Sequence, residues 1–348
     1  GFAKTAVGRR RMRWAEVAAR LESPEAEAYV RAALAKPDNP QDVVAFLSAR
    51  SRRADATLLP ACDPEAGGPW QLGVARVAYL RALGLDAAFR PMVDFLRSDH
   101  ARVRADAEDA LVFWTGRELG ERPEAWTAWR NATLSRPAAA AEGRRYGRST
   151  YYGIPLSPGR SCFVLDVSGS MRAPLSGGAA SYAERSGRVK ELAAPTRLDL
   201  AKEELAAAIG SLHPRAVFQM VFFNSEVFGW RDAPVEAGAE AKEAAKKHLR
   251  RLGPNGATNL HGAVARALCP TDDPIRDFAG SFDAIYLLTD GQPTAGRIVE
   301  SAAIVADLRD RNRGRLVKVH TIGLGEADCA LLGDLSAATG GVFVDLSK

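Results

Sequence analysis

The chain has 348 residues, of which 47% are hydrophobic and 26% are charged, and its formal net charge is +5 at pH 7. These values are ordinary for a globular protein, and they exclude a chain that is disordered throughout. No apolar run approaches the roughly 20 residues of a membrane-spanning helix, so we expect no transmembrane segment in this sequence. The length suggests two domains of common size.

The positive charge lies in the first part of the chain. Residues 1–150 hold 24 Lys and Arg against 19 Asp and Glu, whereas the remainder holds 23 of each. The run Arg9–Arg13 accounts for much of this excess, and we interpret it as a solvated terminus.

The four cysteines have no CxxC spacing, so we predict buried free thiols rather than a zinc or redox site. They are Cys62, Cys162, Cys269 and Cys329.

Residues 1–140 are predicted to be helical. Three consecutive segments carry apolar residues at three- and four-residue spacing and are joined by short connections, so neighbouring helices should run antiparallel. These segments are residues 72–83, 85–96 and 103–114. Antiparallel pairs that bury their apolar faces by stacking are typical of a helical-repeat domain. Trp126 and Trp129, three residues apart on one predicted helix, are interpreted as core or capping residues.

Residues 161–348 show continuous apolar runs separated by helical periods. The runs are CFVLDV from Cys162, AVFQMVFF from Ala216, AIYLLTD from Ala284, LVKVHTIGLG from Leu316 and GVFVDL from Gly341. Such runs are typical of strands that are buried on both faces of a parallel sheet, and their alternation with helices predicts a doubly wound α/β domain. Residues 141–160 are rich in Pro, Gly and Ser, and we predict that they link the two domains.

Polar residues follow two of these runs and precede one predicted helix. Asp166, Ser168 and Ser170 come at the end of the first run, Thr258 lies in a loop before a helix, and Asp290 ends the third run. Ligands of open α/β sheets bind outside the carboxyl ends of the strands, so these side chains should meet there. Two carboxylates and three hydroxyls form an all-oxygen set, which suits Mg²⁺, or Mn²⁺ as a close substitute.

This pattern of Asp-x-Ser-x-Ser, a distal Thr and a distal Asp resembles the metal-ion-dependent adhesion site of von Willebrand factor A (vWA) domains. The resemblance covers residues 160–348 and implies a Rossmann-like, mostly parallel six-stranded sheet with one antiparallel edge strand. It also implies that the hydroxyls bind the ion, that the carboxylates bind it directly or through water, and that an acidic side chain of a partner fills an open position. We therefore predict a metal-dependent protein–protein interaction module with an adhesion or scaffold role, and not an enzyme.

The segment RSDHARVRADAEDALVFWTG, which starts at Arg97, resembles HEAT-like repeats. The order of the two parts resembles bacterial proteins in which helical repeats precede a vWA domain, and the repeats would then offer a second interaction surface. Many proteins of this arrangement are exported or membrane-associated, so the resemblance favours an extracytoplasmic location over a cytoplasmic one. Residues 172–196 are predicted to form a long structureless insertion that acts as a lid or a partner surface.

Two alternatives remain open. Ro ribonucleoproteins also join helical repeats to a vWA domain, so the basic N-terminal part could bind RNA. A metal-dependent hydrolase would need a base near the ion, and His261 lies three residues after Thr258. A packing histidine is the simpler interpretation of His261, because the sequence shows neither GxSxG nor a P-loop.

Overall fold

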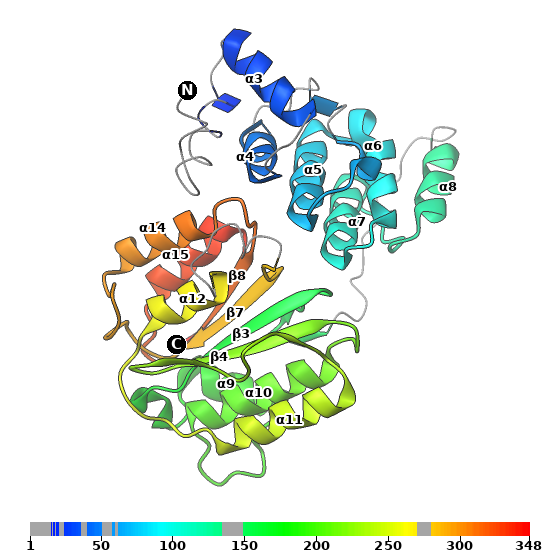
Figure 1. The fold of residues 1–348 in the computed structure, drawn as a ribbon. Coiled ribbons are helices and arrows are strands. Elements are labelled where there is room, and N and C mark those ends of the chain that lie inside the picture. The colour runs from blue at the N-terminus through cyan, green and yellow to red at the C-terminus, as the bar shows by residue number, and fades with distance from the viewer. Residues whose placement is uncertain are drawn as a thin grey trace. The chain divides into compact units, whose positions relative to one another are not determined.

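The computed structural model divides the chain into a helical unit, up to residue 147, and a sheet unit, residues 148–312 and 317–348 (Figure 1). It describes residues 15, 17, 19–20, 24–35, 40–50, 58–59, 62–133, 149–269 and 280–348. The basic run Arg9–Arg13 and the first part of the predicted linker, residues 141–148, lie outside the described residues. In the part of the chain that is described, no helix combines the length and the apolar character needed to cross a bilayer.

The helical unit contains the helices that the apolar spacing predicts. They are α3 (Pro24–Ala35), α4 (Pro40–Arg50), α5 (Trp70–Leu83), α6 (Leu85–Asp94), α7 (Ala101–Thr115) and α8 (Pro123–Thr133), with 3₁₀ turns at Pro64–Ala66 and Phe95–Arg97. Helix α5 packs against α4, α6 and α7, and a Cβ at Gly73 would lie 2.8 Å from the side chain of Val103. Trp126 is fully buried and donates from Nε1 to the carbonyl oxygen of Gly120 at 2.8 Å, which confirms its predicted core role.

The sheet unit contains a mostly parallel sheet, as predicted. Its strands are β3 (Arg160–Asp166), β4 (Val217–Phe223), β5 (Val227–Gly229), β6 (Val235–Glu236), β7 (Ala284–Thr289), β8 (Lys318–Leu324) and β9 (Phe343–Leu346). They are ordered β5-β4-β3-β7-β8-β9, and β6 also pairs with β4. Strands β5 and β6 are antiparallel to β4. The sheet therefore has seven strands rather than six, because two short segments share the antiparallel edge.

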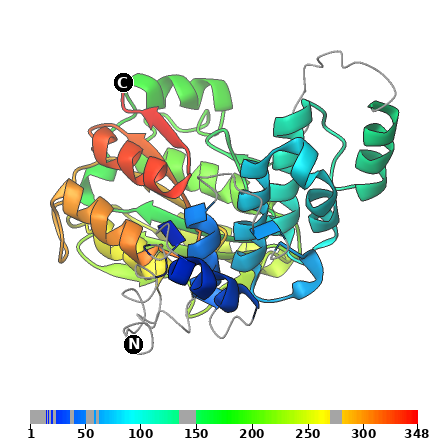
Figure 2. The same ribbon diagram turned by 90° about the horizontal axis from the view of Figure 1, so that it is seen from above.

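Helices cover both faces of this sheet (Figures 1 and 2). Helices α9 (Gly177–Ser186), α10 (Arg197–Ser211) and α11 (Ala239–Arg251) contribute to the core on one face, and α12 (Leu260–Leu268), α14 (Ser301–Arg311) and α15 (Cys329–Thr339) to the core on the other. In β3, Phe163 and Leu165 enter the first core, whereas Cys162 and Val164 enter the second. Burial on both faces explains why the apolar runs do not alternate.

The prediction of buried free thiols is confirmed for three of the four cysteines and is wrong for the burial of Cys329. All four are free thiols, and Cys62, Cys162 and Cys269 are buried whereas Cys329 is partly exposed. Burial raises the pKa of the Cys162 thiol, so this side chain behaves as a small apolar core residue.

A small hairpin precedes β3, formed by β1 (Thr150–Tyr151) and β2 (Ile154–Pro155). Tyr151 and Ile154 are each 1% exposed and belong to the core of the sheet unit. The hydroxyl of Tyr286 in β7 donates to the carbonyl oxygen of Pro155 and accepts from the backbone N–H of Ser157. The described end of the expected linker, residues 149–160, is therefore packed against the sheet.

The insertion of residues 172–196 contains a helix, so the prediction of a structureless loop is wrong. Helix α9 packs against β9, with Ala179 and Ala183 in the core. A Cβ at Gly178 would lie 2.6 Å from the carbonyl oxygen of Lys348, so a glycine is required for this close contact. The two ends of the insertion are joined by a β-bridge between Pro174 and Thr196. The two glycines that open this segment, Gly177 and Gly178, concealed a helix that packs against β9.

Candidate functional site

The loop after β3 places three of the predicted residues. Asp166 is the last residue of β3, and its Oδ1 accepts a hydrogen bond of 2.7 Å from the backbone N–H of Ser168. The hydroxyl oxygens of Ser168 and Ser170 lie 3.0 Å apart. A short 3₁₀ helix, Gly169–Arg172, begins here and turns the chain away from the sheet. The loop thus presents one carboxylate and two hydroxyls on one side.

Thr258 is brought to this loop by backbone contacts. The N–H of Gly169 donates to the carbonyl oxygen of Gly256 at 2.9 Å, and the N–H of Asn255 donates to the carbonyl oxygen of Val167 at 2.8 Å. Gly256 has a φ of +78°, a conformation that favours glycine. The loop before α12 is therefore held against the loop after β3.

Asp290 follows β7, the neighbour of β3 in the sheet. Its Oδ1 accepts a hydrogen bond of 2.7 Å from the hydroxyl of Ser170. A Cβ built on Gly291 would lie 3.6 Å from Oγ of Ser170 and 3.7 Å from Oγ1 of Thr258, so the hydroxyls of two loops converge on this glycine. The structure thus brings all five predicted residues to one end of the sheet.

The carboxylates are buried, while one of the hydroxyl-bearing residues is exposed to solvent. Asp166 and Asp290 are 0% exposed, whereas Ser170 is exposed. Burial raises the pKa of Asp166 to about 6, although hydrogen bonds from Ser168 and Thr289 act in the opposite direction. The nearby charge of Asp290 contributes to this raised pKa. A buried carboxylate of this kind is stabilised by any cation that reaches it.

Two residues of this site were not predicted. The hydroxyl of Thr289 donates to Oδ2 of Asp166 at 2.5 Å, and Nη1 of Arg197 donates to Oδ2 of Asp290 at 2.8 Å. Arg197 is the first residue of α10. A positive charge in the first turn of a helix is unfavourable, because the helix dipole is positive at that end. An arginine at this position therefore indicates an acidic partner elsewhere in the fold. Thr289 gave no signal, because it belongs to an apolar strand.

His261, the candidate general base, binds Asp307 rather than a residue of the site. Nε2 of His261 lies 2.9 Å from Oδ2 of Asp307 in α14, and Nε of Arg311 lies 2.6 Å from the same oxygen. Burial raises the pKa of Asp307, but the hydrogen bonds from His261 and Arg311 outweigh burial and lower it overall. The imidazole therefore joins α12 to α14 through an ion-pair network.

The donor atoms of the site fit a hard divalent cation. Two carboxylates and three hydroxyls are all oxygen ligands, which Mg²⁺ and Mn²⁺ accept and Zn²⁺ accepts less well. Among the residues that the structure describes, there is no group of three or more His, Cys, Asp and Glu side chains that could hold a metal. The hydroxyls are therefore an essential part of any metal site at this position.

Comparisons with known proteins agree on the fold. Residues 189–345 match the family model of the von Willebrand factor type A domain, a span that includes Thr258 and Asp290 but begins after Ser170. The chain is 29% identical over 166 residues to inter-alpha-trypsin inhibitor heavy chain H1 of Sus scrofa, which covers 47% of this chain and 16% of that protein. It is 28% identical over 194 residues to heavy chain H4 of Homo sapiens, covering 55% of this chain and 18% of that protein.

The chain thus spans less than a fifth of the length of these curated relatives. A solved von Willebrand factor type A structure from Catenulispora acidiphila has 23% identity and a TM-score of 0.41, covering 54% of this chain and 38% of that chain. The family match and the parallel sheet agree with the resemblance seen in the sequence: the sheet unit has the fold of a von Willebrand factor type A domain.

Proposed function

We propose that the sheet unit is a metal-dependent module for protein–protein interaction. Mg²⁺, or Mn²⁺ in its place, would be held by five side chains: Asp166, Ser168, Ser170, Thr258 and Asp290. The observation that supports this proposal most directly is the convergence of these residues from three segments around Gly291, with both carboxylates buried. The ion would supply a positive centre that accepts a carboxylate.

The charges of the site favour an acidic partner. Asp166, Asp290 and the guanidinium of Arg197 together leave one net negative charge. A bound divalent cation would convert this to one net positive charge, which a single Asp or Glu side chain of the partner would neutralise. The exposed residue Ser170 marks the side from which that carboxylate would approach.

The other functions considered receive less support. His261 is engaged with Asp307, so we propose no base and no catalytic role for the site. The RNA-binding alternative rested on the basic N-terminal part and on the run Arg9–Arg13; that run lies outside the described residues, and no described contact favours RNA binding. The helical unit would provide a second protein-binding surface, and its likeness to HEAT-like repeats stays a prediction.

Calorimetric titration of Mg²⁺ and Mn²⁺ into metal-stripped protein tests the ion. We expect one ion per chain for wild type and none for Asp166→Ala or Ser170→Ala. The second variant removes an exposed hydroxyl and should leave the fold intact. Asp334→Ala, at an exposed residue of α15, is the matched control and should bind as wild type does. Binding that survives both site variants would contradict the proposal.

The partner carboxylate is tested with Mn²⁺ as a probe. Water bound to Mn²⁺ accelerates the relaxation of bulk water protons, so a ligand that displaces this water lowers the relaxation rate. A short peptide with one Glu should lower it, and the same peptide with Gln should not. Equal effects of the two peptides would exclude a carboxylate as the completing ligand.

A further inference from the structure

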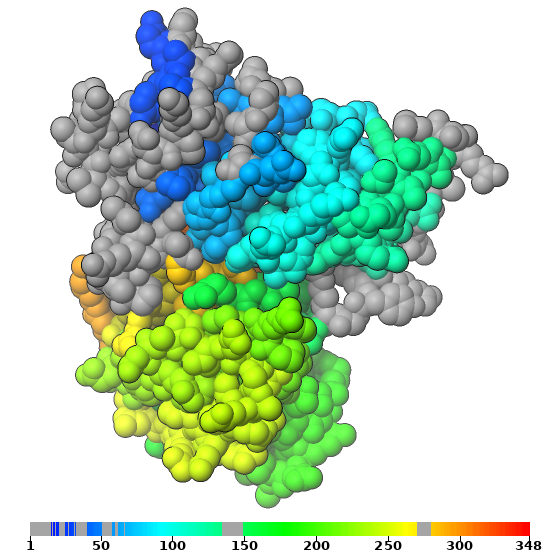
Figure 3. Space-filling view, turned by 45° about the vertical axis from the view of Figure 1, so that its right-hand side comes forward, coloured from blue at the N-terminus to red at the C-terminus, as the bar shows by residue number. Residues whose placement is uncertain are grey.

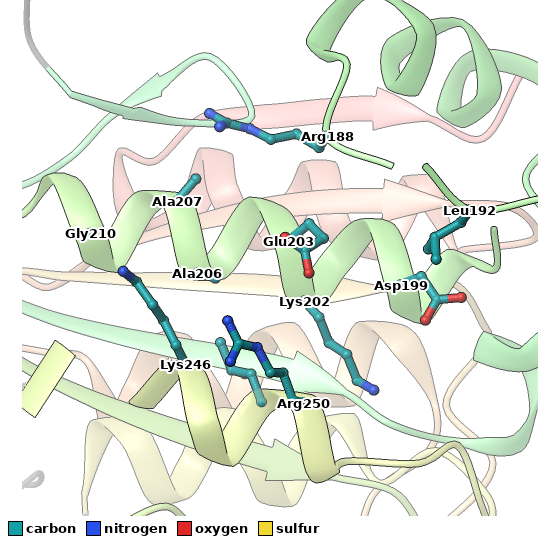
Figure 4. Close-up of a pocket in the computed structure, with 11 residues that line it drawn as sticks. Arg188, Leu192, Asp199, Lys202, Glu203, Ala206, Ala207, Gly210, Lys246 and Arg250 are labelled. Atoms are coloured by element: carbon teal, nitrogen blue, oxygen red, sulfur yellow. The ribbon is translucent and has the colours of Figure 1, made fainter. Parts of the chain in front are cut away.

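A groove lies on the sheet unit between α10 and α11, and the segment at residues 188–192 borders it (Figure 4). Its volume is about 490 Å³, within the range of pockets that bind ligands. The small residues Ala206, Ala207 and Gly210 of α10 line it, together with Leu192 and Leu249. These residues give the groove a shallow apolar surface.

Basic side chains dominate the rest of the lining. Four are basic, namely Arg188, Lys202, Lys246 and Arg250, and two are acidic, namely Asp199 and Glu203. Asp199 is occupied by the helix cap, because its carboxylate accepts from the backbone N–H and the hydroxyl of Thr196. Four basic against two acidic side chains give the lining a formal excess of two positive charges, and Arg188 is itself paired with Glu204.

The cations on α11 are the ones available to a ligand. Figure 4 shows Lys246 and Arg250 extending from α11 toward α10. The side chain of Lys246 is 32% exposed, and its one ion pair among the described residues is with Glu243, a neighbour on its own helix. Arg250 is exposed and has no hydrogen bond or ion pair within 4.0 Å among the described residues, although its charge also helps to lower the pKa of Glu243. Lys202, in contrast, donates to the carbonyl oxygen of Leu252.

The whole of α11 adds to this positive field. Its 13 residues include five Lys and Arg but only two Glu. Of these, Lys247 and Arg251 are exposed without lining the groove. Atoms of this part of the chain, yellow-green in Figure 3, cover much of the visible surface of the sheet unit. A surface of one sign attracts ligands of the opposite sign and accelerates their association.

We propose that this groove holds an acidic segment of a partner protein, with its carboxylates on Lys246 and Arg250. The small residues along α10 leave room for the backbone and the aliphatic stems of Glu side chains. A single-stranded nucleic acid would require aromatic residues for base stacking, and none lines the groove. A membrane surface would require large apolar residues that project outward, whereas the apolar residues here line a recess.

The groove and the proposed metal site lie along one helix. Helix α10 begins at Arg197, which binds Asp290, and the groove reaches Gly210 near the other end of the helix. At 1.5 Å per residue, the two ends are about 20 Å apart. The acidic segment in the groove does not need the metal ion, so this site can be tested with the metal removed.

The test is the binding of a fluorescein-labelled peptide of about ten alternating Glu and Ala residues to the full chain in EDTA, measured by anisotropy. We expect Lys246→Glu with Arg250→Glu to weaken binding about tenfold or more, since these side chains would contact the peptide. The matched control reverses Lys247 and Arg251 on the same helix. This control variant changes the net charge by the same amount but should weaken binding only about threefold, because salt screens charges that do not contact the peptide.

A second variant tests the groove without any change of charge. A Cβ at Gly210 meets only Cε of Lys246 at 3.9 Å, so Gly210→Leu should fold and fill the groove. We expect it to abolish peptide binding, with circular dichroism confirming the fold. Equal weakening by the two charge-reversal variants, or full binding by Gly210→Leu, would overturn the proposal. So would tighter, groove-dependent binding of poly-uridine RNA or of phosphatidylserine vesicles.

Discussion

The ion pair between Arg197 and Asp290 predicts a stability that depends on the metal. The side chain of Asp290 is 0% exposed and that of Arg197 is 12% exposed, so the pair is almost entirely removed from water. Loss of one partner of a buried pair costs about 3–5 kcal/mol, because the other charge is left uncompensated. Since Arg197 keeps some exposure, we expect Arg197→Met to cost about 3 kcal/mol in EDTA.

Mg²⁺ should recover part of that loss, because it would provide the positive charge that Asp290 has lost. Urea unfolding in EDTA and in Mg²⁺ measures both values. We expect the gain from Mg²⁺ to be at least about 1 kcal/mol larger for the variant than for wild type. Arg185→Met, at an exposed residue of α9, is the control and should stay within about 0.5 kcal/mol of wild type. A loss below about 1 kcal/mol in EDTA would refute the role of the buried pair.

Three further variants test neighbouring features. Gly325 has a φ of +52°, and a Cβ at this position would lie 2.2 Å from Cζ of Arg197. Gly325→Ala should therefore displace the guanidinium and reproduce the metal-dependent loss of stability. Urea midpoints equal to those of wild type would contradict this. His261→Ala removes a hydrogen-bond donor to Asp307, so it should lower the free energy of unfolding by about 1–3 kcal/mol in thermal unfolding and leave Mg²⁺ binding unchanged. Loss of Mg²⁺ binding would place His261 in the site. Burial and the charge of Arg251 lower the pKa of His248, so the folded state binds this proton less readily than the unfolded state. The contribution of neutral His248 to the free energy of unfolding is therefore complete above about pH 6.5 and is lost as the pH falls below that value. His248→Gln should reduce the decrease of the urea midpoint between about pH 6.5 and 5. An unchanged slope would refute this origin.

The strands, and the placement of the five candidate residues at one end of the sheet, were predictable because their signals are local. An apolar run that ends in Asp166 or Asp290 indicates both a buried strand and the edge where that strand stops. Arg197 was not predictable as a contact, since its partner lies 93 residues further along the chain. Its position beside the dipole of α10 was the only local indication.

Helix α9 and the hairpin escaped prediction for related reasons. The glycines that open α9 are unfavourable in an isolated helix, and they are explained only by the approach of the backbone of Lys348. The hairpin of residues 150–155 has the Gly and Pro content of a flexible linker. Its contacts with Tyr286 and the burial of Tyr151 and Ile154 in the core distinguish it from one.

That hairpin sets the boundary for recombinant expression of the sheet unit. A shortened gene product that begins at residue 161, with the first apolar run, would lack Tyr151 and Ile154. The ring of Tyr151 packs edge-on against Phe163 and Tyr286, so both rings would become exposed to solvent. Exposed apolar patches of this kind promote aggregation. Expression of this unit for crystallography or display should therefore begin before residue 149, where the hairpin is still intact.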